Sequence, residues 1–134
     1  MIGLDTNILV RYLVQDDPLQ SPKATELIER RLTPDNPGFI SIVAMVETVW
    51  VLDRAYDFTQ QEIASAVERM LQAETLVVDN EQQVFSAMTA VKDGWGEFAD
   101  AVIAALGTKA GCSCTFTFDR KALRLAEFGF RRWD

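Results

Sequence analysis

The stretch Met1-Ile-Gly-Leu-Asp5-Thr6-Asn7-Ile-Leu-Val10 decides the fold. It predicts a short buried strand that ends at one acidic and two small polar residues, after which hydrophobic periodicity resumes as a helix. Asp5 or Thr6 is suited to cap that helix, which we expect to continue to about Val14. A carboxylate at the carboxyl end of a strand lies where open α/β sheets place their ligands.

Strand and helix signals alternate along the rest of the chain. We expect further strands at about 39–42, 76–78, 113–118 and 130–133. Helices are expected at about 21–32, 43–54, 59–71, 80–92 and 97–109, with a short one at about 119–127. Thr59 and Glu62 form a capping box, the strongest local helix start in the chain. This alternation predicts an α/β fold with a parallel sheet covered by helices on both faces.

Length and composition narrow the class of protein. The length of 134 residues fits a single domain spanning residues 1–134, and a net charge of −7 argues against a broad basic surface for duplex DNA. The chain has no histidine, which excludes imidazole catalysis and histidine-ligated zinc. Without a signal-peptide pattern or an apolar run approaching ~20 residues, we expect a cytoplasmic protein with no membrane segment.

Four acidic residues occupy comparable positions in this pattern. Asp5 and Asp119 end predicted strands. Asp100 lies in the first turn of a predicted helix, and Glu47 lies one or two turns into another. Strand carboxyl ends and the starts of the following helices share one edge of a parallel sheet, so the four acids can converge. Helix capping is the alternative for Asp5 and Asp119, and a surface position is the alternative for Glu47.

The neighbours of Glu47 and Asp100 are mostly apolar, which predicts carboxylates on largely buried helix faces. A buried carboxylate without a partner is costly, and clustered carboxylates repel one another. A divalent cation removes both costs, and ligation by oxygen alone favours Mg²⁺ or Mn²⁺. Such sites hydrolyse phosphodiester bonds in line through metal-activated water. Thr6, Asn7, Ser41 and Thr117 could orient the water or a phosphate oxygen, although such residues are also common caps.

Four segments, taken together and in order, resemble a known family. They are residues 1–10, Ser41-Ile-Val-Ala-Met-Val-Glu47, Glu97-Phe-Ala-Asp100-Ala-Val-Ile-Ala-Ala105 and Thr117-Phe-Asp119-Arg-Lys-Ala122. The chain resembles the PIN-domain ribonucleases and, among them, the VapC-type toxins of bacterial toxin–antitoxin pairs. The resemblance implies a three-layer α/β/α fold around a central parallel sheet of four to five strands.

The resemblance also implies an activity and its residues. It implies a metal-dependent endoribonuclease that uses Mg²⁺ (or Mn²⁺), acts on RNA, is inhibited by a cognate antitoxin protein and forms a homodimer. On the family pattern the catalytic and metal-binding residues are Asp5, Glu47, Asp100 and Asp119. Accessory positions are Thr6, Asn7, Ser41, Glu97 and Thr117, and candidate contacts to the RNA backbone are Arg11, Arg120 and Lys121.

Other functions fit the sequence less well. A receiver domain would end its late strand in lysine, where Asp119 stands, and a haloacid-dehalogenase-like phosphatase would have aspartate in place of Asn7. The serious alternative is a non-catalytic PIN-fold module that binds RNA or protein, against which the presence of all four acids argues. Several apolar helix residues are either core or a groove for a partner helix, namely Leu9, Tyr12, Leu13, Leu27, Val49 and Trp50.

Overall fold

A computed structural model describes residues 1–133. The strands are β1 (Ile2–Gly3), β2 (Gly38–Ile40), β3 (Leu76–Val78), β4 (Thr115–Thr117) and β5 (Phe130–Arg132). The α-helices are α1 (Thr6–Val14), α2 (Gln20–Glu26), α3 (Ile42–Tyr56), α4 (Gln60–Gln72), α5 (Glu81–Lys92) and α6 (Phe98–Lys109). A π-helical segment, η1 (Leu27–Arg31), extends α2, and a 3-10 helix, η2 (Ala122–Phe128), precedes β5.

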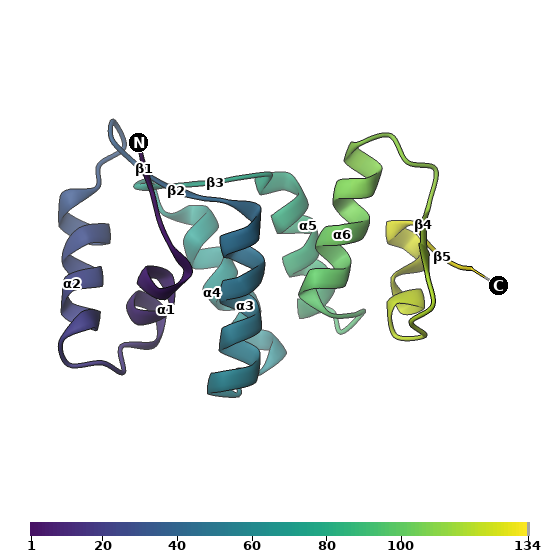
Figure 1. Cartoon of the computed structure of the whole chain (residues 1–134), viewed down its shortest axis with the longest axis horizontal. Helices are drawn as coiled ribbons and strands as arrows, with labels where there is room; N and C mark the ends of the chain where they lie inside the picture. Colours follow the sequence, from purple (N-terminus) through teal and green to yellow (C-terminus); the bar gives the residue numbers. More distant parts are fainter. Residues whose placement is uncertain (134) are drawn as a thin grey trace.

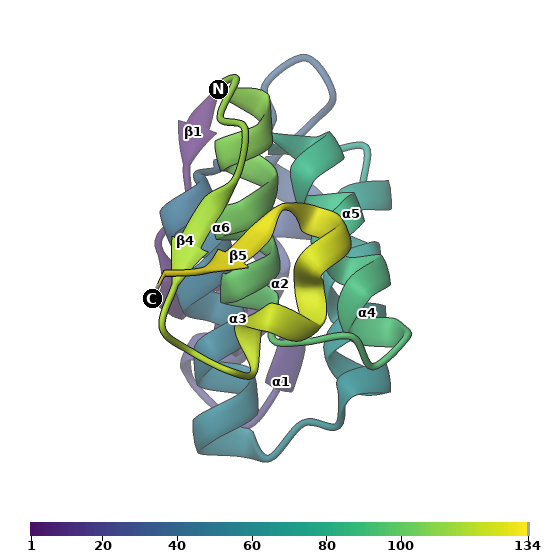
Figure 2. The ribbon, with the colours of Figure 1, turned by 90° about the vertical axis from the view of Figure 1, so that its right-hand side faces the viewer.

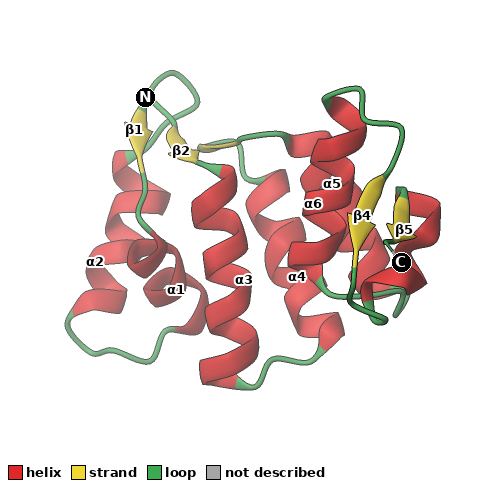
Figure 3. Ribbon diagram, turned by 45° about the vertical axis from the view of Figure 1, so that its right-hand side comes forward, coloured by secondary structure: helices red, strands yellow, loops and turns green. Residues whose placement is uncertain are grey.

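The strands pair in parallel, as expected. β2 is the middle strand of a sheet ordered β1-β2-β3, and β4 pairs with β5 in a second sheet. The mixed α/β fold with parallel strands is therefore confirmed, and the five strands within residues 1–133 are divided between two sheets. α5 and α6 lie between these sheets (Figures 1 and 3), and the side view shows β4 and β5 in front of α6 (Figure 2). Because each strand has only two or three residues, helix packing fixes most of the arrangement.

Local signals in the sequence located the helices well. The capping box of Thr59 and Glu62 is present, and Asp5 and Ser41 are the N-cap residues of α1 and α3. Asn80 occupies the N-cap position of α5, but its side chain accepts a hydrogen bond from Lys109 instead of capping the helix. No helix in the described part of the chain combines the length and apolar character that crossing a bilayer requires.

Two glycines, Gly38 and Gly96, allow leucine side chains to pack against the backbone close to acidic residues. A Cβ at Gly38 would lie 2.7 Å from Cδ1 of Leu4, the buried residue just before Asp5. Gly96 lies just before Glu97 and α6, and a Cβ at Gly96 would lie 2.7 Å from Cδ1 of Leu125. The prediction that the whole first strand is buried was wrong, because β1 is an edge strand and its Ile2 is 43% exposed.

One cluster of buried apolar side chains connects the parts of the fold. It includes Leu4 before α1, Ile40 of β2, Val102 of α6 and Leu125 of η2. Leu9 and Val49, which were candidates for a partner groove, belong to this core, whereas Trp50 is exposed. The groove interpretation is therefore wrong for Leu9 and Val49, since their side chains are already covered by the protein itself.

Candidate active site

Thr6 brings Asp5 and Glu47 together. Asp5 follows β1 and caps α1, where its Oδ1 accepts a hydrogen bond from the Thr6 amide at 2.8 Å. The Thr6 hydroxyl donates a hydrogen bond to Oε1 of Glu47 on α3. Thr6 is only 8% exposed, whereas both carboxylate residues are exposed. A buried hydroxyl thus fixes the position of a carboxylate that solvent and ligands can reach.

The exposure of Glu47 corrects the expectation of a buried helix face. The residues that α3 buries are Ala44, Met45, Thr48, Val49 and Leu52. Glu47 lies on the other face, which it shares with the exposed apolar residues Val43 and Trp50. Because α3 carries large apolar residues on both faces, its sequence did not reveal which face is buried.

Asp5 and Glu47 both line a cleft between α1 and α3, which we call the Asp5 cleft. It has a volume of about 450 Å³ and is lined by Asp5, Thr6, Asn7, Val10, Arg11, Glu47, Trp50, Val51, Ala55 and Tyr56. Asn7, an accessory candidate, is therefore beside the two acids. Oxygen ligands and an open volume make this cleft accessible to a hydrated cation and a polar substrate.

Arg11 is held within this cleft by a hydrogen-bonded network. Its guanidinium donates to Asp16 at 3.1 Å, to the Tyr56 hydroxyl at 3.2 Å and to Gln20 at 2.9 Å. Tyr56 in turn donates to Asp16 at 2.7 Å, and this hydrogen bond is the main cause that lowers the pKa of Asp16. Sequence reasoning missed Tyr56, whose position in the last turn of the helix that carries Glu47 was the available signal.

A second group of acids lies at the start of α6. Asp100 is half-buried in the first turn of α6, and Glu97 immediately precedes the helix. Burial is the main cause that raises the pKa of Asp100, and the negative charges of Glu97 and Asp119 raise it further. These three residues are therefore close enough to interact electrostatically, although Asp119 belongs to a distant part of the sequence.

Asp119 lies in an exposed turn after β4. Its Oδ1 accepts a hydrogen bond from the Lys121 amide at 2.9 Å, and its own amide donates to Oγ1 of Thr117 at 3.0 Å. Thr117 therefore has a structural role in shaping this turn. The side chains of Arg120 and Lys121 are exposed beside Asp119.

The start of α3 is held by two side chains, of which only one was a candidate. Ser41 Oγ accepts a hydrogen bond from the Ala44 amide at 3.1 Å, so its position is explained by capping. Asp79, directly after β3, accepts a hydrogen bond from the Ile42 amide at 3.3 Å. Sequence reasoning missed Asp79, although an acid after a strand is the same signal that identified Asp5.

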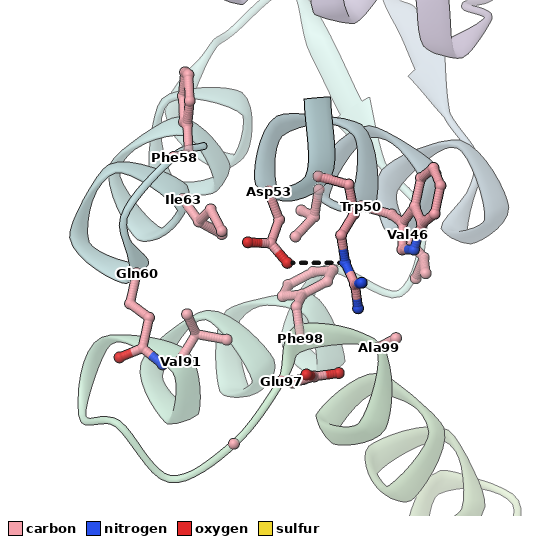
Figure 4. A pocket seen from close by; sticks show the side chains of 13 residues that line it. Val46, Trp50, Asp53, Phe58, Gln60, Ile63, Val91, Glu97, Phe98 and Ala99 are labelled. Carbon is pink, nitrogen blue, oxygen red and sulfur yellow. Dashed lines mark ion pairs between the residues drawn. The ribbon is translucent and has the colours of Figure 1, made fainter. Parts of the chain in front are cut away.

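Trp50 lines two clefts, one beside each acidic group. It lines the Asp5 cleft and also a second cleft of about 200 Å³, the Glu97 cleft, whose lining includes Val46, Trp50, Asp53, Arg54, Glu97 and Phe98. Figure 4 looks into the Glu97 cleft, with Asp53 of α3 pointing toward Phe98 at the start of α6. The structure thus forms two acidic groups: Asp5 with Glu47 at the Asp5 cleft, and Asp100 with Glu97 and Asp119 near the start of α6.

The donor atoms fit a hydrated Mg²⁺ or Mn²⁺ better than a fully protein-ligated metal. Within residues 1–133, no three Asp, Glu, His or Cys side chains are gathered closely enough to hold a metal ion. Mg²⁺ commonly needs only one or two carboxylates because it keeps several waters. Asp5 with Glu47 offers such an oxygen-only pair, which does not suit zinc.

Comparison with known proteins confirms the PIN-domain part of the resemblance seen in the sequence. The family model described as PIN domain matches residues 2–128 of the chain. The matched range includes both acidic groups, both clefts and the strands of the two sheets up to β4. No curated protein matches the chain.

Proposed function

We propose that this chain, which belongs to the PIN domain family, is a metal-dependent endoribonuclease. PIN domains are generally metal-dependent nucleases that act on RNA or DNA. The observation that carries the proposal is the link from Asp5 through Thr6 to Glu47, which holds two carboxylates at an open cleft inside the matched range.

Each acid has a proposed role that follows from its position. Asp5 and Glu47 would hold the Mg²⁺ or Mn²⁺ at the Asp5 cleft. Asp100 in the first turn of α6 and Asp119 in the turn after β4 would serve the same hydrolytic reaction. When bound, the ion supplies activation of water and stabilises charge at the phosphate. Thr6 keeps the Glu47 carboxylate in position, so that its oxygens need not reorganise when substrate arrives.

The basic residues near the acids are proposed to contact the RNA backbone. Nε and Nη1 of Arg11 donate to Gln20, Asp16 and Tyr56, which orients the guanidinium, so Nη2 is the group proposed to contact a phosphate oxygen. Arg120 and Lys121 are exposed next to Asp119. Because the chain carries a net charge of −7, these local cations are needed to offset repulsion between the protein and RNA.

Within this function we propose the role of a VapC-type toxin that forms a homodimer and is inhibited by a cognate antitoxin protein. The resemblance of the four sequence segments supports this role. Exposed apolar side chains provide surface for partners, among them Val43, Ile103 and Phe116. An antitoxin that places an arginine or lysine against the exposed acids would block the site by charge pairing.

Incubation of the purified protein with total cellular RNA tests the enzymatic proposal. New RNA ends are expected with Mg²⁺ or Mn²⁺ and not with chelator, and Glu47→Gln is expected to remove them. Glu68→Gln on α4 is the matched control, since Glu68 is also an exposed helical glutamate and should leave cleavage unchanged. RNA binding without cleavage under any metal condition would favour the non-catalytic module.

The toxin role needs a separate experiment in cells. Expression of the chain alone is expected to arrest growth, and co-expression of the neighbouring small gene is expected to relieve the arrest. Normal growth together with cleavage that the neighbouring product does not inhibit would reject the toxin role and leave the nuclease proposal intact.

A further inference from the structure

We propose that Trp50 is a stacking platform for a nucleobase and that single-stranded RNA crosses the exposed face of α3 between the two acidic groups. This inference rests on the proposed ribonuclease function and names how that site holds its substrate. It concerns three residues of α3, Glu47, Trp50 and Arg54, which we call the α3 stripe.

The spacing of the α3 stripe places its members on one face of the helix. Glu47, Trp50 and Arg54 are separated by three and then four positions, so they are neighbours along the helix surface. The stripe extends about 10 Å along the helix axis. The carboxylate of Glu47 suits metal-assisted cleavage. The flat ring of Trp50 suits stacking on a base, and the guanidinium of Arg54 suits a phosphate.

The position of Trp50 makes it the crossing point for a substrate strand. Trp50 lines the Asp5 cleft together with Glu47, and it lines the Glu97 cleft together with Arg54. Figure 4 shows Trp50 and Glu97 in the Glu97 cleft. An RNA strand that occupies both clefts would meet this ring, because Trp50 lines each of them. Stacking on the ring would hold a base on one side while the adjacent phosphate lies at the acids.

The fold makes little use of the Trp50 ring, which leaves it available to a ligand. The side chain is 59% exposed, and its indole has no ring partner or hydrogen-bond partner within residues 1–133. Arg54 is paired with its neighbour Asp53 at 3.5 Å, and both side chains are more than half exposed. Such a surface pair is weak, so the Arg54 guanidinium can exchange its partner for a phosphate.

The chemistry beside the ring favours RNA over a protein partner. Single-stranded RNA is recognised by stacking of unpaired bases on aromatic rings. Each cleft beside Trp50 carries one arginine, Arg11 or Arg54, and two acidic residues, so the proposed metal ion would be needed to attract the RNA backbone. Stacking requires a flat ring, whereas docking of an apolar protein surface requires only apolar bulk. Substitutions that separate flatness from bulk therefore distinguish the two partners.

Equilibrium binding of a fluorescently labelled single-stranded RNA of about 10 nucleotides tests this inference. The measurement uses Ca²⁺ in place of Mg²⁺ and compares Trp50→Ala, Trp50→Leu and Trp50→Phe with the unaltered protein. Phe85→Ala on α5 is the matched control, because Phe85 is 57% exposed and lines neither the Asp5 cleft nor the Glu97 cleft. Circular dichroism checks that each variant is folded.

Trp50→Ala and Trp50→Leu are expected to weaken binding at least about fivefold, Trp50→Phe by less, and Phe85→Ala not at all. Binding by Trp50→Leu as tight as by the unaltered protein would overturn the stacking role. If all Trp50 variants bind RNA as tightly as the unaltered protein but no longer form the complex with the proposed antitoxin, the ring would be assigned to a protein partner instead. If the unaltered protein binds no RNA and cuts none, the proposed function itself fails, and the inference fails with it.

Discussion

The hydroxyl of Thr6 donates a hydrogen bond to the carboxylate of Glu47 and so joins the start of α1 to α3 across 41 positions of the sequence. The amide of the same residue donates to the carboxylate of Asp5. One threonine therefore positions two of the acids that we propose to be catalytic, which makes it the most informative residue for testing how the site is organised.

Thr6→Val removes the hydroxyl but keeps the shape of the side chain. Because Glu47 loses its fixed partner, RNA cleavage is expected to fall by about 10-fold to 100-fold, as for groups that orient metal ligands. The free energy of unfolding should fall by about 1 kcal/mol. Cleavage kinetics and denaturant unfolding measure the two effects. Thr89→Val, at an exposed threonine of α5, is the control, and equal cleavage by both variants would remove Thr6 from the site.

Asp5 is both a helix cap and a proposed metal ligand, and two substitutions separate these roles. Asn caps helices about as well as Asp, so Asp5→Asn should keep the free energy of unfolding in chelator while it abolishes cleavage. Asp5→Ala should abolish cleavage and also lower the free energy of unfolding by about 1 kcal/mol. If Asp5→Asn lowers the free energy of unfolding as much as Asp5→Ala does, the charge of Asp5, and not its capping hydrogen bond, stabilises α1.

Asp100 should make stability depend on pH in a particular direction. Burial and the charges of Glu97 and Asp119 raise the pKa of Asp100 in the folded protein, so the folded state binds the proton more tightly than the unfolded state. The contribution of Asp100 to the free energy of unfolding is fully present below its pKa in the unfolded state, and it is lost as the pH rises through its pKa in the folded state. Asp100→Asn should therefore stabilise the protein at neutral pH and lose this advantage in acid.

Asp16 provides the control of opposite sign. Hydrogen bonds from Tyr56 and Arg11 lower the pKa of Asp16, so its contribution is present above the unfolded pKa and is lost as the pH falls through the folded pKa. Asp16→Asn should destabilise the protein at neutral pH. Thermal melting of both variants across the acidic range tests the pair, and a neutral-pH loss of stability in Asp100→Asn would contradict the stated burial of that carboxyl.

Ser41 is expected to stabilise α3 without taking part in cleavage. Ser41→Ala should lower the free energy of unfolding by about 1 kcal/mol, and Ser41→Asn should restore most of it, because Asn also caps helices. Neither change should alter the cleavage rate per folded molecule. A loss of cleavage in the well-folded Ser41→Asn variant would return Ser41 to the list of site residues.

Sequence predicted what is decided locally. The cap at Asp5, the capping box of Thr59 and Glu62, and β3 at residues 76–78 all follow from the side chains of a few adjacent residues. These signals also placed the acids at the ends of strands and the starts of helices. The α/β class followed in turn from the order of the elements, which the sequence shows directly.

The remaining features depend on partners that are distant in the sequence. β1 and β4 lie in different sheets, and the side-chain pattern of a short strand does not specify which other strand it pairs with. The exposure of Glu47 depends on which face of α3 meets the core, and apolar residues occur on both faces. The link between Glu47 and Thr6 and the network of Arg11 with Tyr56 became visible only once α1 and α3 were placed side by side.

The central claim is that the two acidic groups, Asp5 with Glu47 and Asp100 with Glu97 and Asp119, serve one hydrolytic reaction. The most direct test is the rate of RNA cleavage at saturating Mg²⁺ by Asp5→Asn and by Asp119→Asn, with Glu68→Gln as the control. Both aspartate variants are expected to cleave about 100-fold more slowly or worse, while the control keeps the full rate. Full activity of Asp119→Asn beside an inactive Asp5→Asn would contradict the claim and confine the site to the Asp5 cleft.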